Sequence, residues 1–184
     1  MQLPLRKVIL NKMEIIKIGL SDIEQLQIIG KQTFLETFAE ANSEENMQKY
    51  LEEHFTVDML SAELTNLNSE FYFAKLNNKV VGYLKINFGE AQTEIKDQKA
   101  LEIERIYVLK EFHGMQVGQI LFNTALNSAI KTNAHFVWLG VWEENSRAIS
   151  FYKKNGFVEF EKHIFKLGDE EQTDIMMKLQ IGMH

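Results

Sequence analysis

The sequence predicts a single-domain α/β fold of the α+β kind, with a mixed, mostly antiparallel sheet of about seven strands flanked by helices. Three observations predict it. The 184 residues suit one domain. Helical and alternating apolar patterns succeed one another along the whole chain, without a repeat or a linker. The single proline, Pro4, leaves the rest of the chain free for regular helices and strands.

Residues 1–12 are expected to form an N-terminal extension, and residues 13–184 the domain. The basic pair Arg6 and Lys7 precedes a short apolar run, Val8–Leu10. A secretory signal needs a longer apolar region and a small-residue cleavage site. The sequence therefore favours a cytoplasmic protein.

The first part of the domain is predicted to be one strand followed by helices. Met13–Ile18 alternates as a strand does, and Ser21–Glu24 has the spacing of a capping box. Ser43 is a good cap for a second helix, and Asp58–Leu67 is a short third one. Helical spacing in the first helix is kept by five apolar residues, Ile23, Leu26, Ile29, Phe34 and Phe38.

The pattern then changes to the period of strands. Glu70–Lys75 and Val80–Phe88 are predicted strands, joined by a hairpin turn at Asn77-Asn78. Gly89–Lys99 is polar and is expected to be a loop. Leu101–Val108 alternates apolar and polar residues, so we expect a strand with one buried face.

Helices and strands alternate in the last third of the chain. Gly114–Lys131 is a predicted helix, and the apolar run Phe136–Val141 suits a central strand. Asn145–Lys154 is a second helix, stopped by the Asn155-Gly156 pair. Two strands close the chain, Phe157–Leu167 and Thr173–Leu179.

Composition excludes several classes of protein and of site. No apolar run reaches the roughly 18 residues of a membrane helix, so we expect no membrane partner. The absence of cysteine excludes disulfides and Cys-ligated zinc, and the histidines show no metal spacing, so no metal site is expected. A net charge of −6 argues against nucleic acid and suits a cationic or neutral partner.

The turn Lys110–Gln119 is a candidate anion site. It carries Gly114 and Gly118 and leads into a predicted helix, whose first N–H groups and dipole attract phosphate. Neither a P-loop nor the dinucleotide fingerprint is present. The alternative is that two glycines simply start a helix after a strand.

The run Trp138–Phe157 is the second informative segment. It contains Asn145 after a predicted strand and Tyr152 near the end of the following helix. A tyrosine that faces a cleft can donate a proton to a leaving group. The alternative is a core aromatic residue with its hydroxyl at the rim.

Taken together, these two segments resemble the Gcn5-related N-acetyltransferase (GNAT) superfamily. Its Arg/Gln-x-x-Gly-x-Gly/Ala signature falls on His113, Gln116 and Gly118, with two departures, His for Arg/Gln and Gln for Gly. The segments LEIERIYV, WLGVWEENSRAISFYKKNGF, GDEEQTD and SEENMQKYL are most similar to Pai-type bacterial spermidine/spermine N-acetyltransferases. The likeness spans nearly all of Met13–Leu179.

The resemblance implies acetyl-CoA as co-substrate and a sheet that splays between its fourth and fifth strands, with pantetheine in the gap. Tyr152 is implied as the acid that protonates the leaving thiolate, and the Val108 N–H as the group that polarises the thioester. Glu104 is our choice of base, directly or through water, with Glu102 as the runner-up; the alternative for both is a solvated strand face. The cofactor-binding residues implied are Ile106, Tyr107, Val108, His113, Gly114, Met115, Gln116, Val117, Gly118, Gln119, Asn145 and Lys154.

The resemblance implies that the acceptor is a primary amine, above all a polyamine such as spermidine or spermine. Acidic residues of the early helices are a candidate rim for it, or else a solvated face: Glu36, Glu44, Glu45, Glu52 and Glu53. Other amines, a protein N-terminus, or a CoA-binding regulator with little catalysis remain alternatives. A homodimer is a further expectation.

Overall fold

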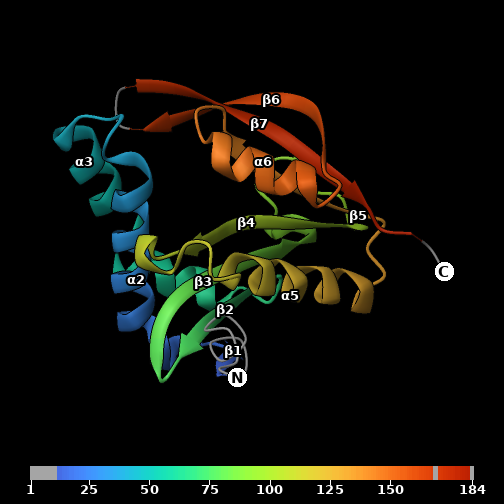
Figure 1. Ribbon diagram of the computed structural model, residues 1–184, viewed down its shortest axis with the longest axis horizontal. Coiled ribbons are helices and arrows are strands. Elements are labelled where there is room, and N and C mark those ends of the chain that lie inside the picture. The colour runs from blue at the N-terminus through green and yellow to red at the C-terminus, as the bar shows by residue number, and fades with distance from the viewer. Residues whose placement is uncertain (1–11, 168–169, 183–184) are drawn as a thin grey trace, which may run out of the picture.

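The computed structural model describes residues 12–167 and 170–182, and its seven strands form one sheet in the order β1-β2-β3-β4-β5-β7-β6 (Figure 1). The predicted extension therefore lies almost entirely outside the described residues. The strands are β1 (Met13–Lys17), β2 (Ser69–Leu76), β3 (Lys79–Phe88), β4 (Ala100–Val108), β5 (Phe136–Trp142), β6 (Val158–Leu167) and β7 (Glu170–Gln180). All neighbours are antiparallel except β4 and β5, which confirms the predicted mixed sheet.

Helices cover both faces of this sheet. The α-helices are α2 (Ile23–Phe38), α3 (Glu44–His54), α4 (Val57–Thr65), α5 (Val117–Lys131) and α6 (Ser146–Lys154). Phe73 and Tyr83 face each other across β2 and β3 and are buried in a core with α2 and α4. Leu84 is buried on the opposite face with α5. Alternate side chains of β3 are thus buried in two separate cores, one on each face of the sheet.

Two of the three predicted helix caps and turns described next are confirmed. Ser43 caps α3 by accepting the Asn46 N–H at 3.2 Å. Asn77 and Asn78 have φ of 50° and 65°, as a two-residue hairpin turn requires. The capping box at Ser21 is wrong: Leu20–Asp22 is a 3₁₀ turn, and the Asp22 carboxylate, a stronger acceptor than a hydroxyl, accepts the Gly19 N–H at 3.2 Å.

The fourth and fifth strands part soon after they meet. β4 and β5 pair only from Ala100 to Glu102 with Phe136 to Trp138, and beyond these residues no pairing joins them. This confirms the splay. In Figure 1 the two strands separate toward the side on which α2 and α3 lie.

A β-bulge sits where β4 begins to leave its partner. Lys85 of β3 pairs with Arg105, but the next residue, Ile86, pairs with Ile103, so Glu104 is an extra residue. A bulge bends a strand and disrupts its alternation. The prediction of a single buried face is therefore wrong here: Glu102 is buried along with its apolar neighbours.

No helix among residues 12–167 and 170–182 is long and apolar enough to cross a membrane.

Candidate active site

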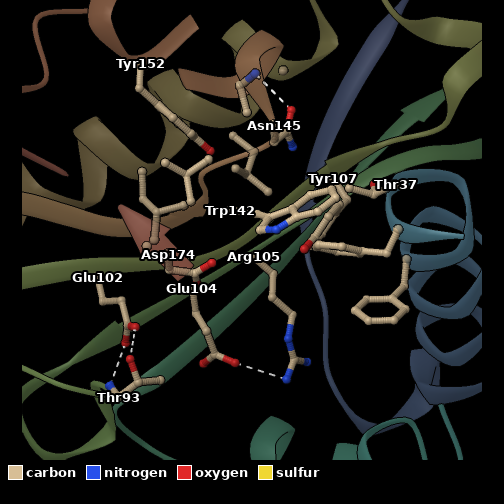
Figure 2. A pocket seen from close by; sticks show the side chains of 18 of the residues that line it. Thr37, Thr93, Glu102, Glu104, Arg105, Tyr107, Trp142, Asn145, Tyr152 and Asp174 are labelled. Atoms are coloured by element: carbon tan, nitrogen blue, oxygen red, sulfur yellow. Dashed lines mark hydrogen bonds and ion pairs between the residues drawn. The ribbon is translucent and has the colours of Figure 1, made fainter. Parts of the chain in front are cut away.

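A cavity of about 550 Å³ opens where β4 and β5 part (Figure 2). Its walls come from Glu102–Val108 of β4, Gly140–Trp142 of β5, and side chains of α2, α3, α6 and β7. The runner-up base Glu102 lines it. Of the other residues predicted as catalytic or cofactor-binding, eight line it: Glu104, Ile106, Tyr107, Val108, His113, Gly118, Asn145 and Tyr152. Six do not line it: Gly114, Met115, Gln116, Val117, Gln119 and Lys154.

The exposed edge of β4 presents backbone N–H groups to the gap. The N–H of Leu109 donates to the Val81 carbonyl of β3 at 3.0 Å. Successive residues of a strand direct their N–H groups to opposite sides, so those of Ile106 and Val108 point away from β3, toward β5. Because β5 has diverged at this level, an extended ligand can pair with these groups as an added strand.

The turn after β4 ends in the open N-terminus of α5. Gly114 and Gln116 have φ of 78° and 65°, and the helix starts at Val117, three residues later than predicted. The left-handed backbone at Gln116 is the reason, because it cannot continue a helix. The first N–H groups of α5, those of Val117 to Gln119, have no partner within the helix. They lie at its N-terminus, which is the positive end of the helix dipole.

His113 is held between two neighbours and lies beside a cation that sequence reasoning missed. Its Nε2 is 2.8 Å from the Val108 carbonyl oxygen, and Arg147 of α6 contacts its Nδ1. A guanidinium only donates, so Nδ1 accepts and Nε2–H donates to Val108. Burial lowers the pKa of His113, and Arg147 lowers it further against the effect of that carbonyl. Arg147 also lines the cavity and thus places a permanent positive charge beside His113. We call this end of the cavity its mouth.

Tyr152 is buried, with 6% of its surface exposed, and its hydroxyl end reaches the cavity (Figure 2). The ring packs 5.4 Å from that of Phe151 and 5.6 Å from that of Phe157. Both alternatives raised by the sequence are therefore present in one residue: a core ring and a hydroxyl at a rim. Burial raises the pKa of Tyr152, so its proton is present throughout the neutral range.

Asn145 combines a structural task with a position at the cavity. Its Oδ1 accepts the Ala148 N–H at 3.1 Å and so caps α6. Its Nδ2 makes no bond to the described part of the chain and is available to a ligand. Lys154 lies exposed at the other end of the same helix.

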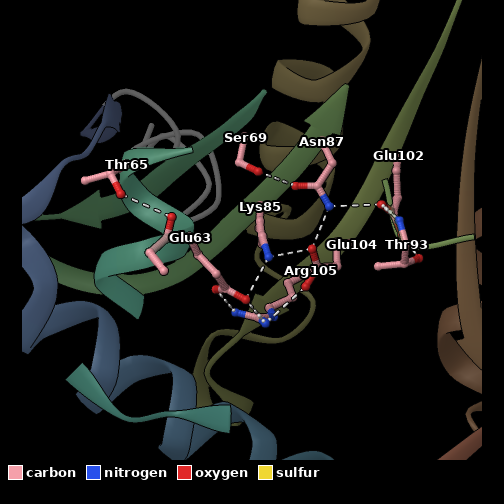
Figure 3. A network of polar contacts seen from close by, with 10 residues as sticks. Glu63, Thr65, Ser69, Lys85, Asn87, Thr93, Glu102, Glu104 and Arg105 are labelled. Atoms are coloured by element: carbon pink, nitrogen blue, oxygen red, sulfur yellow. Dashed lines mark hydrogen bonds and ion pairs between the residues drawn. The ribbon is translucent and has the colours of Figure 1, made fainter. Parts of the chain in front are cut away.

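Glu104 belongs to a buried cluster of charges (Figure 3). Its Oε2 lies 2.6 Å from Lys85 Nζ, and its Oε1 lies 3.0 Å from Arg105. Glu63 of α4 completes the cluster, 2.9 Å from Lys85 and 2.8 Å from Arg105. Burial acts to raise the pKa of Glu104, but the two cations outweigh it and the pKa is lowered. Glu104 is therefore ionised at neutral pH.

Glu102 is bound differently, although Asn87 joins the two carboxylates. Asn87 Nδ2 donates to Glu102 at 2.9 Å and to Glu104 at 2.6 Å. Thr93 donates to Glu102 through its backbone N–H, at 2.9 Å, and through its hydroxyl. Burial raises the pKa of Glu102, and the Glu104 carboxylate raises it further, against the hydrogen bonds from Thr93 and Asn87.

The cavity is lined by acidic residues, but not by those expected from the early helices. None of the five predicted rim residues lines it. The carboxylates that do so are Glu63, Glu94, Glu102, Glu104 and Asp174. Asp174 of β7 was missed because only the antiparallel pairing of β7 with β5 brings it to the gap.

No group of three or more His, Asp or Glu within the described ranges is arranged to hold a metal ion.

The sequence is similar to a known protein family and to several individual N-acetyltransferases. A model of the acetyltransferase (GNAT) family matches residues 32–157. An uncharacterised N-acetyltransferase of Lactobacillus delbrueckii subsp. lactis is 39% identical over 165 residues, which cover 90% of this chain and 95% of the relative. A spermidine N(1)-acetyltransferase of Thermoplasma acidophilum is 27% identical over 169 residues, covering 90% and 95% of the two chains.

Solved structures share the same fold. The PaiA N-acetyltransferase of Thermoplasma acidophilum, crystallised in complex with coenzyme A, superimposes with a TM-score of 0.76. It is 23% identical, and the match covers 92% of this chain and 99% of that one. At this identity the likeness shows the fold, and it confirms the predicted single-domain architecture.

Proposed function

Since the chain belongs to the acetyltransferase (GNAT) family and is an N-acetyltransferase, we propose that it transfers acetyl from acetyl-CoA to a polyamine such as spermidine. One observation carries this proposal: a strand gap lined with backbone donors opens into a cavity rich in carboxylates. The gap suits the extended arm of the thioester, and the carboxylates suit a polycation. We expect the reaction to take place in the cytoplasm.

The residues around the gap fit acetyl-CoA. The N–H groups of Ile106 and Val108 bind the pantetheine arm, and the Val108 N–H also stabilises negative charge on the thioester oxygen. The Nδ2 of Asn145 adds a donor to that arm. The amides of residues 113–119 and the Arg147 guanidinium bind phosphate at the mouth. Acetyl-CoA, when bound, supplies an acyl group with a thiolate as leaving group.

Tyr152 is the proposed acid. A leaving thiolate needs a proton, because a thiol has a pKa of about 8.5. The hydroxyl of Tyr152 is at the cavity, and its raised pKa guarantees that it carries the proton when the sulfur departs.

Glu104 is the proposed base, acting through water. An alkyl ammonium has a pKa of about 10 and must lose a proton before it can attack. The Glu104 carboxylate is ionised and lines the cavity, although Lys85 and Arg105 occupy part of its oxygen surface. A water molecule between the amine and Glu104 allows the proton to pass without breaking these ion pairs. Glu102, with its raised pKa, is the second choice.

The polyamine assignment is supported by charge and by one relative. Five carboxylates and two guanidiniums are among the residues that line the cavity. Such a cavity concentrates cations. The Thermoplasma relative named above acts on spermidine.

A thiol-release assay tests the proposal. Purified protein is given acetyl-CoA with spermidine, spermine, a monoamine, an amino acid and a peptide with a free N-terminus. We expect the highest kcat/KM for the polyamines. Preference for the peptide would overturn the polyamine assignment and leave the transferase. Binding of acetyl-CoA without turnover of any amine would favour a regulator instead.

A further inference from the structure

Three of the carboxylates that line the cavity, Glu63, Glu94 and Asp174, have no part in the proton transfers described so far. Asp174 of β7 lies opposite Trp142 of β5 and beside Gly140. A Cβ atom at Gly140 would be 3.3 Å from Asp174 Oδ2, so the glycine leaves room for the carboxylate at the gap. Figure 2 shows Asp174 turned into the pocket in which Tyr152 and Glu104 also lie.

Asp174, which is half-buried, lacks the partners that Glu102 and Glu104 have. Within residues 12–167 and 170–182 it makes neither a hydrogen bond nor an ion pair, whereas Glu102 accepts hydrogen bonds and Glu104 forms ion pairs. His163 of β6 lies opposite Asp174 in the sheet but pairs with Glu94 at 3.1 Å. A partly desolvated carboxylate without a donor is destabilised, and a ligand that supplies a donor relieves this.

The electrostatic surroundings of Asp174 favour a cation. Burial raises the pKa of Asp174 to about 6, against a lowering effect of His163. Asp174 in turn is one of the charges that raise the pKa of Tyr50, whose ring comes from α3. Glu104 and Arg105 from β4 line the same cavity, and they are already paired with each other. At pH 7 the carboxylate is therefore mainly ionised, and no partner among the described residues occupies it.

We propose that Asp174 binds an ammonium group of the acceptor and selects cationic di- and polyamines, an inference that rests on the proposed function. An alkyl ammonium carries three N–H donors and a positive charge, which the unpartnered carboxylate can accept as charge-assisted hydrogen bonds. An acceptor with its own carboxylate beside the amine, such as a free amino acid, is repelled at this position. Asp174 is thus a substrate-binding residue, and Glu104 and Tyr152 keep their roles in proton transfer.

The test distinguishes a role of Asp174 in binding the amine from a role in the acetyl transfer step. Asp174→Asn keeps the size of the side chain and removes its charge. We expect KM for spermidine to rise at least about tenfold, with kcat changed less than about threefold and with the affinity for acetyl-CoA unchanged. Calorimetric titration of spermidine into the CoA-bound protein gives the same comparison without turnover. Glu171→Gln, which removes an exposed charge from the same strand, is the matched control and leaves both constants unchanged.

A second measurement uses the unaltered protein. Spermidine keeps its charges between pH 5 and pH 8, so we expect its KM to rise as the pH falls through about 6, where Asp174 takes up a proton. The Asn variant loses this dependence if it folds. An unchanged KM in Asp174→Asn, or a flat pH profile in the wild type, overturns the inference while spermidine turnover stands. Absence of turnover with every polyamine overturns the proposed function itself.

Discussion

Lys85 and Glu104 form a buried ion pair, with 2.6 Å between Nζ and Oε2, at the point where the cavity meets the core. The β-bulge makes this pair possible, because it inserts Glu104 into β4 next to Arg105, the residue that pairs with Lys85. The same cavity contains Asp174 without such a partner, and the pKa values of the two carboxylates shift in opposite directions. Glu104 is held ionised by two cations, whereas Asp174 has no such partner among the described residues.

Glu104→Gln is expected to reduce both stability and turnover. Without the carboxylate, Lys85 and Arg105 share Glu63 alone, and breaking a buried ion pair costs about 3 kcal/mol in the free energy of unfolding. Urea unfolding measures this change. Glu159→Gln, which breaks the exposed pair with Lys153, is the control and should cost under about 1 kcal/mol.

The pH dependence of stability gives Glu104 a second signature. Its pKa is lower in the folded protein than the ordinary value of 4.5, so its stabilising effect is complete above 4.5 and is lost as the pH falls through the lower, folded value. We expect the Gln variant to lose less stability than the wild type across this acidic range. Equal acid sensitivity of the two proteins would show that the pair contributes little. Undiminished turnover of the variant across pH would remove Glu104 as the base.

Tyr152→Phe is expected to lower kcat about a hundredfold, as the loss of a general acid does. The ring contacts with Phe151 and Phe157 remain, so the affinity for acetyl-CoA should change little. Steady-state kinetics and calorimetry measure the two quantities separately. Tyr72→Phe, on β2 outside the cavity, is the control for loss of a tyrosine hydroxyl. If kcat of Tyr152→Phe equals that of the control, Tyr152 is not the acid.

Arg147→Ala should weaken the binding of acetyl-CoA more than Lys154→Ala does. Arg147 lies at the cavity beside His113, whereas Lys154 is exposed at the far end of α6. Loss of a charge-assisted bond to phosphate is worth about 2 kcal/mol, or roughly a thirtyfold rise in Kd. Calorimetric titration of both variants at one salt concentration makes the comparison. A larger effect of Lys154 would move the phosphate site away from Arg147.

Salt is expected to raise KM for spermidine. The acidic cavity attracts a polycation, and this attraction is screened as ionic strength increases. A monoamine carries one charge, so its KM should rise less over the same range. Initial rates between low and high sodium chloride test this difference. An equal rise of KM for both amines would mean that the extra charges of the polyamine do not contribute to its binding in the cavity.

The fold could be predicted from sequence wherever the interactions of a few neighbouring residues decide the local structure. The Asn77-Asn78 turn and the Ser43 cap each depend on a few neighbouring residues, and both are confirmed. The bulge at Glu104 was not accessible, because it depends on the register of β4 against β3. The alternation that placed Glu102 and Glu104 on one face therefore failed at the residue proposed as the base.

The site was predictable along β4 and α6 and was missed where separate elements meet. The prediction identified Ile106, Val108 and Tyr152, which line the cavity. Arg147 was missed because its contact with His113 joins the start of α6 to the turn before α5. Asp174 was missed because a strand pattern does not reveal which neighbour, here the glycine of β5, leaves room for a carboxylate.

The most direct measurement is mass spectrometry of spermidine incubated with acetyl-CoA and the purified protein, together with thiol release in the same samples. The account predicts one acetylated spermidine for each free CoA, and loss of both products when spermidine is omitted. Thiol release without acetylated spermidine, or neither product at any protein concentration, would contradict it.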